Sequence, residues 1–208
     1  MNSIEKLKKG FADFKNSYYG GDFKKSAEYA KLITEGQQPK TLMIACSDSR
    51  VSPEITFNSN PGDIFMVRNI ANIVPPYDND GHKHGTSAAI EFAVNYLGVE
   101  NIIVKGHANC GGIAALMKDV STGDFISPWV SVSARAKEEV LKNSEFSTDE
   151  ERRTACEKAS ILVSLENLLT FPFVRKKYVR GEIKILGWYF DMPKGLLLEY
   201  NNETGRFQ

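Results

Sequence analysis

The sequence predicts one α/β domain built on a largely parallel central β-sheet flanked by helices. Short apolar runs of strand length alternate along the chain with segments of helical periodicity, an order typical of parallel sheets. The chain has 208 residues, of which 42% are hydrophobic and 25% charged, and these values suit one soluble globular domain. No repeat, low-complexity segment or linker divides it, so we expect a single domain over residues 1–208.

Two amphipathic helices are expected first, over residues 3–16 and 22–36. Apolar residues recur at helical spacing in both segments, Gly20-Gly21 separates them, and Asp22 is expected to cap the second. These helices precede an α/β core that we place at residues 41–208.

The core begins with a strand at 41–46, where Thr-Leu-Met-Ile-Ala-Cys forms the short apolar run expected of a buried parallel strand. The Pro61-Gly62 turn leads into the strand expected at 63–68. Gly98 closes the helix expected at 84–97, and Pro172 ends the one expected at 148–170. The other expected elements are, in order, a strand at 63–68, a helix at 84–97, a strand at 101–105, a short helix at 111–118, helices near 128–144 and 148–170, and strands at 182–190 and 196–200.

Composition excludes several classes of protein. The 26 basic and 26 acidic residues cancel, which argues against a nucleic-acid binder that works by neutralising phosphates. No apolar run approaches the ~20 residues of a membrane span. The first residues form neither a secretory nor a transit peptide, so we expect a cytoplasmic protein with no membrane or nucleic-acid partner.

Two of the three cysteines follow strands of the predicted sheet. Cys46 ends the first strand, and His107 and Cys110 follow the third, so all three should emerge at one edge of the sheet. Two cysteines and one histidine with an open fourth position form a known catalytic zinc arrangement, whereas a structural site fills all four positions. His82 and His84 could supply a fourth ligand but are interpreted as solvated loop residues. The third cysteine, Cys156, lies in a helical pattern and is interpreted as a core thiol.

Asp48 and Arg50 come from the same turn as Cys46. An aspartate beside a metal can accept a hydrogen bond from a metal-bound hydroxide, and a paired arginine would keep it ionised and away from the metal. The alternative is an aspartate that only caps the turn, with an unrelated surface arginine. The glycines after Cys110 would let the backbone approach the metal closely. Cys110 also precedes a helix, and the positive end of the helix dipole favours the thiolate form of this cysteine.

A series of short motifs surrounds these residues. They are Cys46-Ser47-Asp48-Ser49-Arg50, Pro61-Gly62-Asp63, Arg68-Asn69-Ile70-Ala71-Asn72, Pro75-Pro76-Tyr77, the helix start at 85–91, and His107-Ala108-Asn109-Cys110-Gly111-Gly112. Together they resemble the signature of the β-class carbonic anhydrases, and the resemblance runs from about residue 20 to Tyr200. Met43 stands where the bacterial subgroup with a regulatory bicarbonate site carries tryptophan, so the chain resembles the plant-like (type I) subgroup.

The resemblance implies a reaction and a set of site residues. The reaction is the reversible hydration of CO2 to bicarbonate and a proton, by attack of a zinc-bound hydroxide. It implies that Zn2+ is held by Cys46, His107 and Cys110 and that Asp48 and Arg50 form the catalytic dyad. The implied substrate-site residues are Gln37, Phe65, Ile70, Phe92 and Gly111, with Phe92 where plant-like members usually carry tyrosine.

The resemblance also implies self-association. In this family the pocket lies at a dimer interface and N-terminal helices wrap the partner. We therefore expect residues 1–36 to form a helical arm in a homodimer or a dimer-built tetramer.

Two alternatives stay open at this point, and residue spacing argues against a third. A phosphatase-type cysteine nucleophile needs five residues between cysteine and arginine, whereas three separate Cys46 from Arg50. A non-catalytic zinc or anion-binding module would bind metal without turnover. A carbonyl sulfide or carbon disulfide hydrolase would use the same site on a sulfur substrate.

Overall fold

The computed structural model describes residues 1–21, 23–118 and 123–208. Contacts between residues divide the chain into two compact units, Met1–Gln38 and Pro39–Gln208, which are described separately below. Among the described helices, none combines the length and the apolar composition needed to cross a membrane.

The first unit is helical, as the sequence predicts. It contains α1 (Ser3–Asn16), a π-helical turn at Ser17–Gly21 and α2 (Phe23–Glu35). A capping box begins α1, since Asn2 accepts the Glu5 amide at 2.9 Å and Glu5 accepts the Asn2 amide at 3.0 Å. The expected cap of the second helix, Asp22, lies outside the described residues.

The second unit contains a six-stranded sheet with the order β2-β1-β3-β4-β5-β6. Neighbours among the first four strands are parallel, whereas β5 and β6 add in antiparallel fashion, so the largely parallel sheet is confirmed. The strands are β1 (Thr41–Cys46), β2 (Ile64–Asn69), β3 (Asn101–His107), β4 (Lys184–Asp191), β5 (Leu196–Asn201) and the two-residue β6 (Arg206–Phe207), which was not expected.

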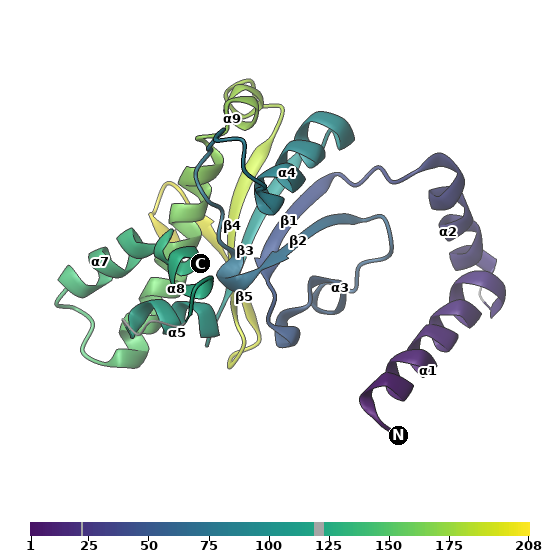
Figure 1. Cartoon of the computed structure of the whole chain (residues 1–208), viewed down its shortest axis with the longest axis horizontal. Coiled ribbons are helices and arrows are strands. Elements are labelled where there is room, and N and C mark those ends of the chain that lie inside the picture. The colour runs from purple at the N-terminus through teal and green to yellow at the C-terminus, as the bar shows by residue number, and fades with distance from the viewer. Residues whose placement is uncertain (22, 119–122) are drawn as a thin grey trace. The chain divides into compact units, whose positions relative to one another are not determined.

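Helices lie on both sides of this sheet (Figure 1). They are α3 (Pro53–Thr56), α4 (Gly85–Glu91) with a π-helical continuation at Phe92–Leu97, α5 (Gly111–Met117), α6 (Ile126–Ser131), α7 (Ala134–Lys142), α8 (Asp149–Leu168) and α9 (Pro172–Val179). Short 3-10 turns at Ser49–Val51 and Ile70–Asn72 follow β1 and β2.

One predicted helix is wrong. The segment expected as a single helix near 128–144 is two helices, α6 and α7, separated at Ser133, where φ is −97° and ψ is 16°. The Ser133 hydroxyl is fully buried and lies 2.9 Å from that of Ser160 on α8. At the break, the backbone amides of Val132 and Ser133 donate to carbonyl oxygens three residues earlier, those of Trp129 and Val130, instead of four residues earlier. The spacing of apolar residues does not reveal this change.

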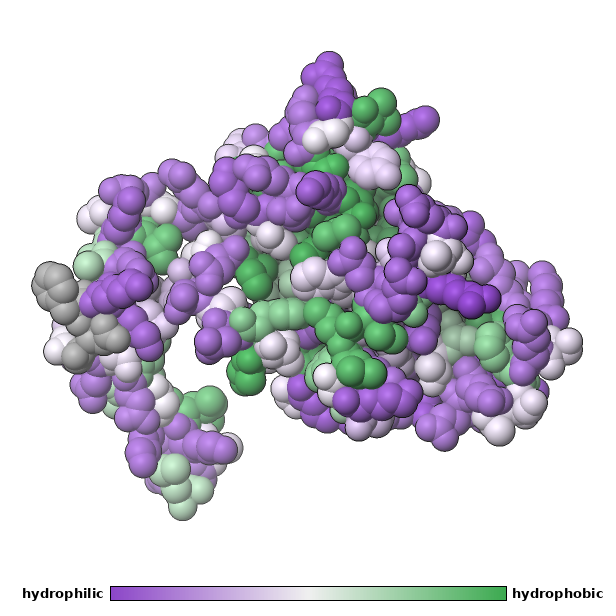
Figure 2. Space-filling view, turned by 180° about the vertical axis from the view of Figure 1, so that it is seen from behind, coloured by the Kyte–Doolittle hydropathy of each residue, from purple (hydrophilic) through white to green (hydrophobic). Residues whose placement is uncertain are grey.

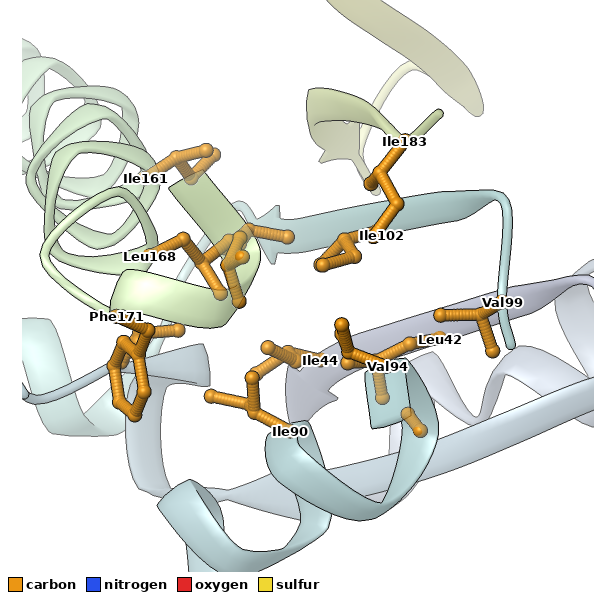
Figure 3. Packing of buried hydrophobic residues seen from close by; sticks show 14 of the residues in the cluster. Leu42, Ile44, Ile90, Val94, Val99, Ile102, Ile161, Leu168, Phe171 and Ile183 are labelled. Atoms are coloured by element: carbon orange, nitrogen blue, oxygen red, sulfur yellow. The ribbon is translucent and has the colours of Figure 1, made fainter. Parts of the chain in front are cut away.

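The main hydrophobic core lies between the sheet and the helices on one face. Leu42 and Ile44 of β1 point to this face and meet Ile90 from α4 and Ile161 and Leu168 from α8 (Figure 3). The alternate β1 residues, Met43 and Ala45, point to the other face, where Phe57 and Trp188 pack beside them. Because both faces of β1 are buried, its run of apolar residues is uninterrupted.

The register of the sheet positions the site. β1 and β3 are adjacent and parallel with Ala45 opposite Lys105, so the next residue, Cys46, and the last residue of β3, His107, leave the sheet at the same edge. This edge is formed by the carboxyl ends of the strands, where parallel sheets carry their sites.

Candidate metal centre

Three predicted ligands meet at this edge of the sheet. The possible ligand atoms of Cys46, His107 and Cys110 lie within 4.8 Å of one another, and all three residues are buried. The two sulfur atoms are 4.0 Å apart. Two sulfurs bound at ~2.3 Å to one tetrahedral zinc are separated by roughly 3.8 Å, so the donor set and its spacing fit zinc.

The imidazole of His107 is oriented for a metal. Its Nδ1 lies 2.8 Å from the backbone oxygen of Ala108, so Nδ1 carries the proton and Nε2 presents its lone pair. Nε2 is buried and has no hydrogen-bond partner among the described residues. A metal ion between the two sulfurs and Nε2 would satisfy this atom.

Backbone amides surround both sulfur atoms. The amides of Asp48 and Ala71 act to lower the pKa of Cys46, and those of Gly112 and Ile113 act in the same direction on Cys110. The hydrogen bond from Cys110 lowers the pKa of the Cys46 thiol to about 4, and the same bond raises the pKa of Cys110. The cradle of amides favours thiolates, the form in which cysteine binds metals.

Of the two glycines after Cys110, Gly112 is the one that makes close contacts. A Cβ at Gly112 would lie 2.7 Å from Ile70 Cγ2 and 2.9 Å from Ala71 Cβ, whereas a Cβ at Gly111 would have no atom within 4 Å. Gly112 therefore permits the start of α5 to pack against the turn at Ile70–Asn72.

Asp48 and Arg50 form a bidentate ion pair. Arg50 donates its Nε to Asp48 Oδ1 at 3.0 Å and its Nη2 to Oδ2 at 2.6 Å, and the Arg50 amide also donates to Oδ1 at 2.9 Å. These bonds hold the pKa of the Asp48 carboxyl well below its usual range. Arg50 Nη2 also lies 3.2 Å from the backbone oxygen of Asn109, in the turn between His107 and Cys110. The pair is thus tied to both ligand-bearing segments.

Arg68 and Lys105 hold the loop that carries this ion pair, a contact that sequence reasoning missed. Arg68 on β2 donates to the backbone oxygens of Cys46 at 3.0 Å and Asp48 at 2.6 Å. Lys105 on β3 donates to the backbone oxygen of Val51 at 3.2 Å. The available signal was a cation near the end of each of these two strands, where a charge that is partly or fully buried needs a partner.

The predicted substrate residues are distributed over both units. The rings of Phe65 on β2 and Phe92 after α4 are in contact, with centroids 5.8 Å apart, and Ile70 lies at the start of the 3-10 turn after β2. Gly111 is the first residue of α5. Gln37 is an exposed residue of the other unit, Met1–Gln38, so its role remains a prediction.

The remaining histidines and the third cysteine are not part of the metal group. His84 is paired with Asp80 at 2.7 Å, and His82 is an exposed residue of the same loop. Cys156 is fully buried in α8 as a free thiol, as the sequence predicts.

Comparison with known proteins agrees with this geometry. The carbonic anhydrase family model matches residues 41–197. The chain is 40% identical to β carbonic anhydrase 3 of Arabidopsis thaliana over 94% of its own length and 76% of that protein. The chain belongs to the β-class carbonic anhydrases. This carbonic anhydrase is therefore a carbonate dehydratase, and its cofactor is zinc.

Other relatives extend the comparison. The carbonic anhydrase is 45% identical to the chloroplastic β carbonic anhydrase 5 of Arabidopsis thaliana, over 90% of its own length and 62% of that protein. Among solved structures, the β-carbonic anhydrase CcaA superposes with a TM-score of 0.87 at 30% identity, covering 99% of this chain and 98% of that one. One of two tetrameric β-carbonic anhydrases from Sordaria macrospora gives 0.75 at 30% identity, covering 94% of both chains.

Proposed function

We propose that this carbonic anhydrase hydrates CO2 with Asp48 and Arg50 acting together beside the metal group. The observation that carries the proposal is the bidentate Arg50–Asp48 pair, tied to the segments that bear Cys46 and Cys110. Zinc, when bound, lowers the pKa of a coordinated water toward neutrality and so supplies the nucleophile.

The role of Asp48 follows from counting its hydrogen bonds. Oδ1 accepts two N–H groups of Arg50, whereas Oδ2 accepts one. A carboxylate oxygen offers two lone pairs, so Oδ2 keeps one for the hydrogen of the attacking water. Because Arg50 keeps Asp48 ionised, the carboxylate accepts that hydrogen and aims the oxygen lone pair at CO2.

The role of Arg50 is to restrain the carboxylate. Its planar guanidinium fixes both carboxylate oxygens and reaches the Asn109 backbone at the same time. This restraint holds the Asp48 carboxylate against Arg50, so that a zinc ion held by Cys46, His107 and Cys110 would stay accessible to water. Phe65, Ile70 and Phe92 are proposed to provide apolar contacts for CO2, with Gln37 and Gly111 also in the substrate site.

The test is the initial rate of CO2 hydration by zinc-loaded protein at about pH 8.5, followed by the colour change of a pH indicator in a stopped-flow instrument. We expect Asp48→Asn to lower kcat by about 100-fold or more at unchanged zinc content. Glu166→Gln is the matched control, because Glu166 also pairs with an arginine, Arg135, but on the surface of α7 and α8. Wild-type kcat in Asp48→Asn would contradict the dyad.

The same assay separates the alternatives. A background rate with CO2 but turnover of carbonyl sulfide or carbon disulfide would assign the site to sulfur substrates. Bound zinc with no turnover of any of these would favour a binding module.

We also propose that the enzyme is a homodimer or a dimer-built tetramer. Support comes from the relative described as tetrameric and from apolar side chains that gather on one face of the Pro39–Gln208 unit, which Figure 2 shows in green. Phe92 and Tyr96 are 44% and 76% exposed in the single chain. A monomeric mass by light scattering at micromolar concentration would overturn this proposal.

We also propose a cytoplasmic location, on the evidence of the cysteines alone. The three cysteines are buried and none of them is in a disulfide, which suits a reducing compartment. Cell fractionation would test it, and recovery of the protein in an organelle would overturn it.

A further inference from the structure

A buried carboxylate lies directly behind the metal ligand Cys110. Glu157, in the middle of α8, is 3% exposed. Its Oε1 accepts the backbone amide of Cys110 at 3.0 Å, and its Oε2 accepts the hydroxyl of Tyr189 on β4 at 2.8 Å. Because a buried carboxylate needs donors around it, these bonds fix where Glu157 lies.

The Cys110 amide needs this partner for a reason that lies in α5. Cys110 is the N-cap of α5, and the residue that usually accepts an N-cap amide is a glutamate or glutamine at the third helical position. In α5 that position is Ile113, which has no acceptor in its side chain. Glu157 supplies the missing acceptor from another helix, 47 positions later in the chain.

Arg153, one turn earlier on α8, extends the contact to the neighbouring residue. Its Nη2 donates to Asn109 Oδ1 at 2.8 Å, and its Nε lies 3.9 Å from Glu157 Oε1. Asn109 has a left-handed backbone with φ of 58°, and its backbone oxygen accepts Arg50. The turn between His107 and Cys110 is thus held at the Asn109 side chain, the Asn109 oxygen and the Cys110 amide.

We propose that Glu157 is a positioning residue for the metal centre. By holding the Cys110 amide it keeps the Cys110 sulfur where that atom, Cys46 and His107 bind one ion. Tyr189 and Arg153 in turn hold Glu157. The inference rests on the metal group of the proposed function but requires neither the role of Asp48 nor turnover of CO2.

The experiment measures the zinc dissociation constant by competition with a chromophoric chelator. Loss of an outer partner of a metal ligand weakens binding by about 10–100-fold. We expect about 100-fold for Glu157→Leu, which removes both acceptors, and about tenfold for Glu157→Gln, whose amide oxygen still accepts the Cys110 amide. Ser160→Ala is the matched control, because Ser160 is buried on the same helix and bonds to Ser133 instead. Its zinc affinity should stay within about twofold of wild type.

A second readout separates positioning from general loss of stability. In cobalt-substituted protein the thiolate-to-cobalt absorption bands report the geometry of the two sulfurs. We expect them to change in Glu157→Leu and to remain as in wild type in Ser160→Ala. Unchanged bands and unchanged zinc affinity in both Glu157 variants would overturn the proposal.

Tyr189→Phe keeps the inference testable if the Glu157 variants do not fold. It removes one of the groups that hold Glu157, so zinc should bind several-fold more weakly, and wild-type affinity would count against the proposal. The CO2 hydration rate of the wild type is measured on the same samples. An inactive wild type would contradict the proposed function alone, since the comparison of zinc affinities would still stand.

Discussion

At the scale of single residues, Gly112 is a position where one added carbon disturbs the metal centre. A Cβ there would lie 2.7 Å from Ile70 and 2.9 Å from Ala71, both in the turn that packs against Cys46. Side chains forced into a packed interior typically reduce stability by about 1–3 kcal/mol. We expect Gly112→Ala to lower the free energy of unfolding by this amount, measured by denaturant titration.

Gly111→Ala is the matched control for this prediction. The added carbon at Gly111 would have no neighbour within 4 Å, and both glycines lie in the first turn of α5. Alanine is a better helix former than glycine, so the free energy of unfolding should stay the same or rise by up to about 1 kcal/mol. Equal losses in the two variants would show that close packing at Gly112 is not the cause.

Cys156 carries a prediction about pH. Burial, with the nearby charge of Glu157, raises the pKa of this thiol from 9.0 to about 12. Between pH 9.0 and about 12, the Cys156 thiol has lost its proton in the unfolded chain but still holds it in the folded chain. Stability from this group is therefore complete below pH 9.0 and is lost as pH rises toward about 12.

The measurement compares wild type with Cys156→Ala over this pH range. The free energy of unfolding of wild type minus that of the variant should fall with pH, by at most about 1.4 kcal/mol per pH unit. Iodoacetamide near pH 8 should leave Cys156 unmodified in the folded protein, because the thiolate is the reactive form. A difference that stays constant with pH, or rapid modification of Cys156, would contradict the assignment of a buried neutral thiol.

At the scale of elements, α8 is the helix that carries Arg153 and Glu157, and its start depends on Thr148. Thr148 accepts the Glu151 amide at 3.1 Å, and Glu151 accepts the Thr148 amide at 2.9 Å. Removing such a cap costs about 1 kcal/mol. We expect Thr148→Ala to lower the free energy of unfolding by about this amount and to speed amide hydrogen exchange in the first turn of α8.

Ser147→Ala is the control, because the described contacts of Ser147 involve its backbone amide, which donates to Glu151 at 2.8 Å. This variant should differ from wild type by less than about 0.5 kcal/mol. If the two variants lose stability equally, the hydroxyl of Thr148 is not the stabilising group.

Elements also show which parts of the fold the sequence can predict. β1 and β3 were predictable because both faces are buried, which leaves an uninterrupted apolar run. The break at Ser133 was not, since a local change in backbone angles leaves the spacing of the apolar residues around it unchanged. The four-residue α3 was also missed, because a single turn has too few residues to show a periodicity.

The same reasoning applies to the candidate site. Cys46, His107 and Cys110 were predictable because each lies at or just after the end of a strand, and the topology brings those ends together. Glu157 was not predictable, because a glutamate in a charged helical segment has the pattern of an exposed residue. Only the packing of α8 behind Cys110 shows that it is buried.

At the scale of the whole molecule, the metal group joins β1, β3 and the start of α5, so metal binding should stabilise the whole Pro39–Gln208 unit. A ligand that binds only the folded state at ~1,000 times its dissociation constant adds about 4 kcal/mol. For a chain of this size each kcal/mol shifts Tm by about 2–4 °C. We therefore expect removal of zinc by a chelator to lower Tm by roughly 10 °C, measured by calorimetry at fixed protein concentration.

Two controls make this prediction specific. Zinc added back after removal of the chelator should restore Tm. The same chelator should leave the Tm of a Cys110→Ala variant nearly unchanged, because that variant lacks one of the three proposed ligands. Tm should fall for two physical reasons. Without an ion, His107 Nε2 is a buried polar atom with no hydrogen-bond partner among the described residues. The sulfurs of Cys46 and Cys110 then share a hydrogen bond, so one of the two keeps its proton. If atomic absorption verifies that zinc has left wild type and Tm does not move, the three elements are held together by packing alone, and the metal serves only the reaction.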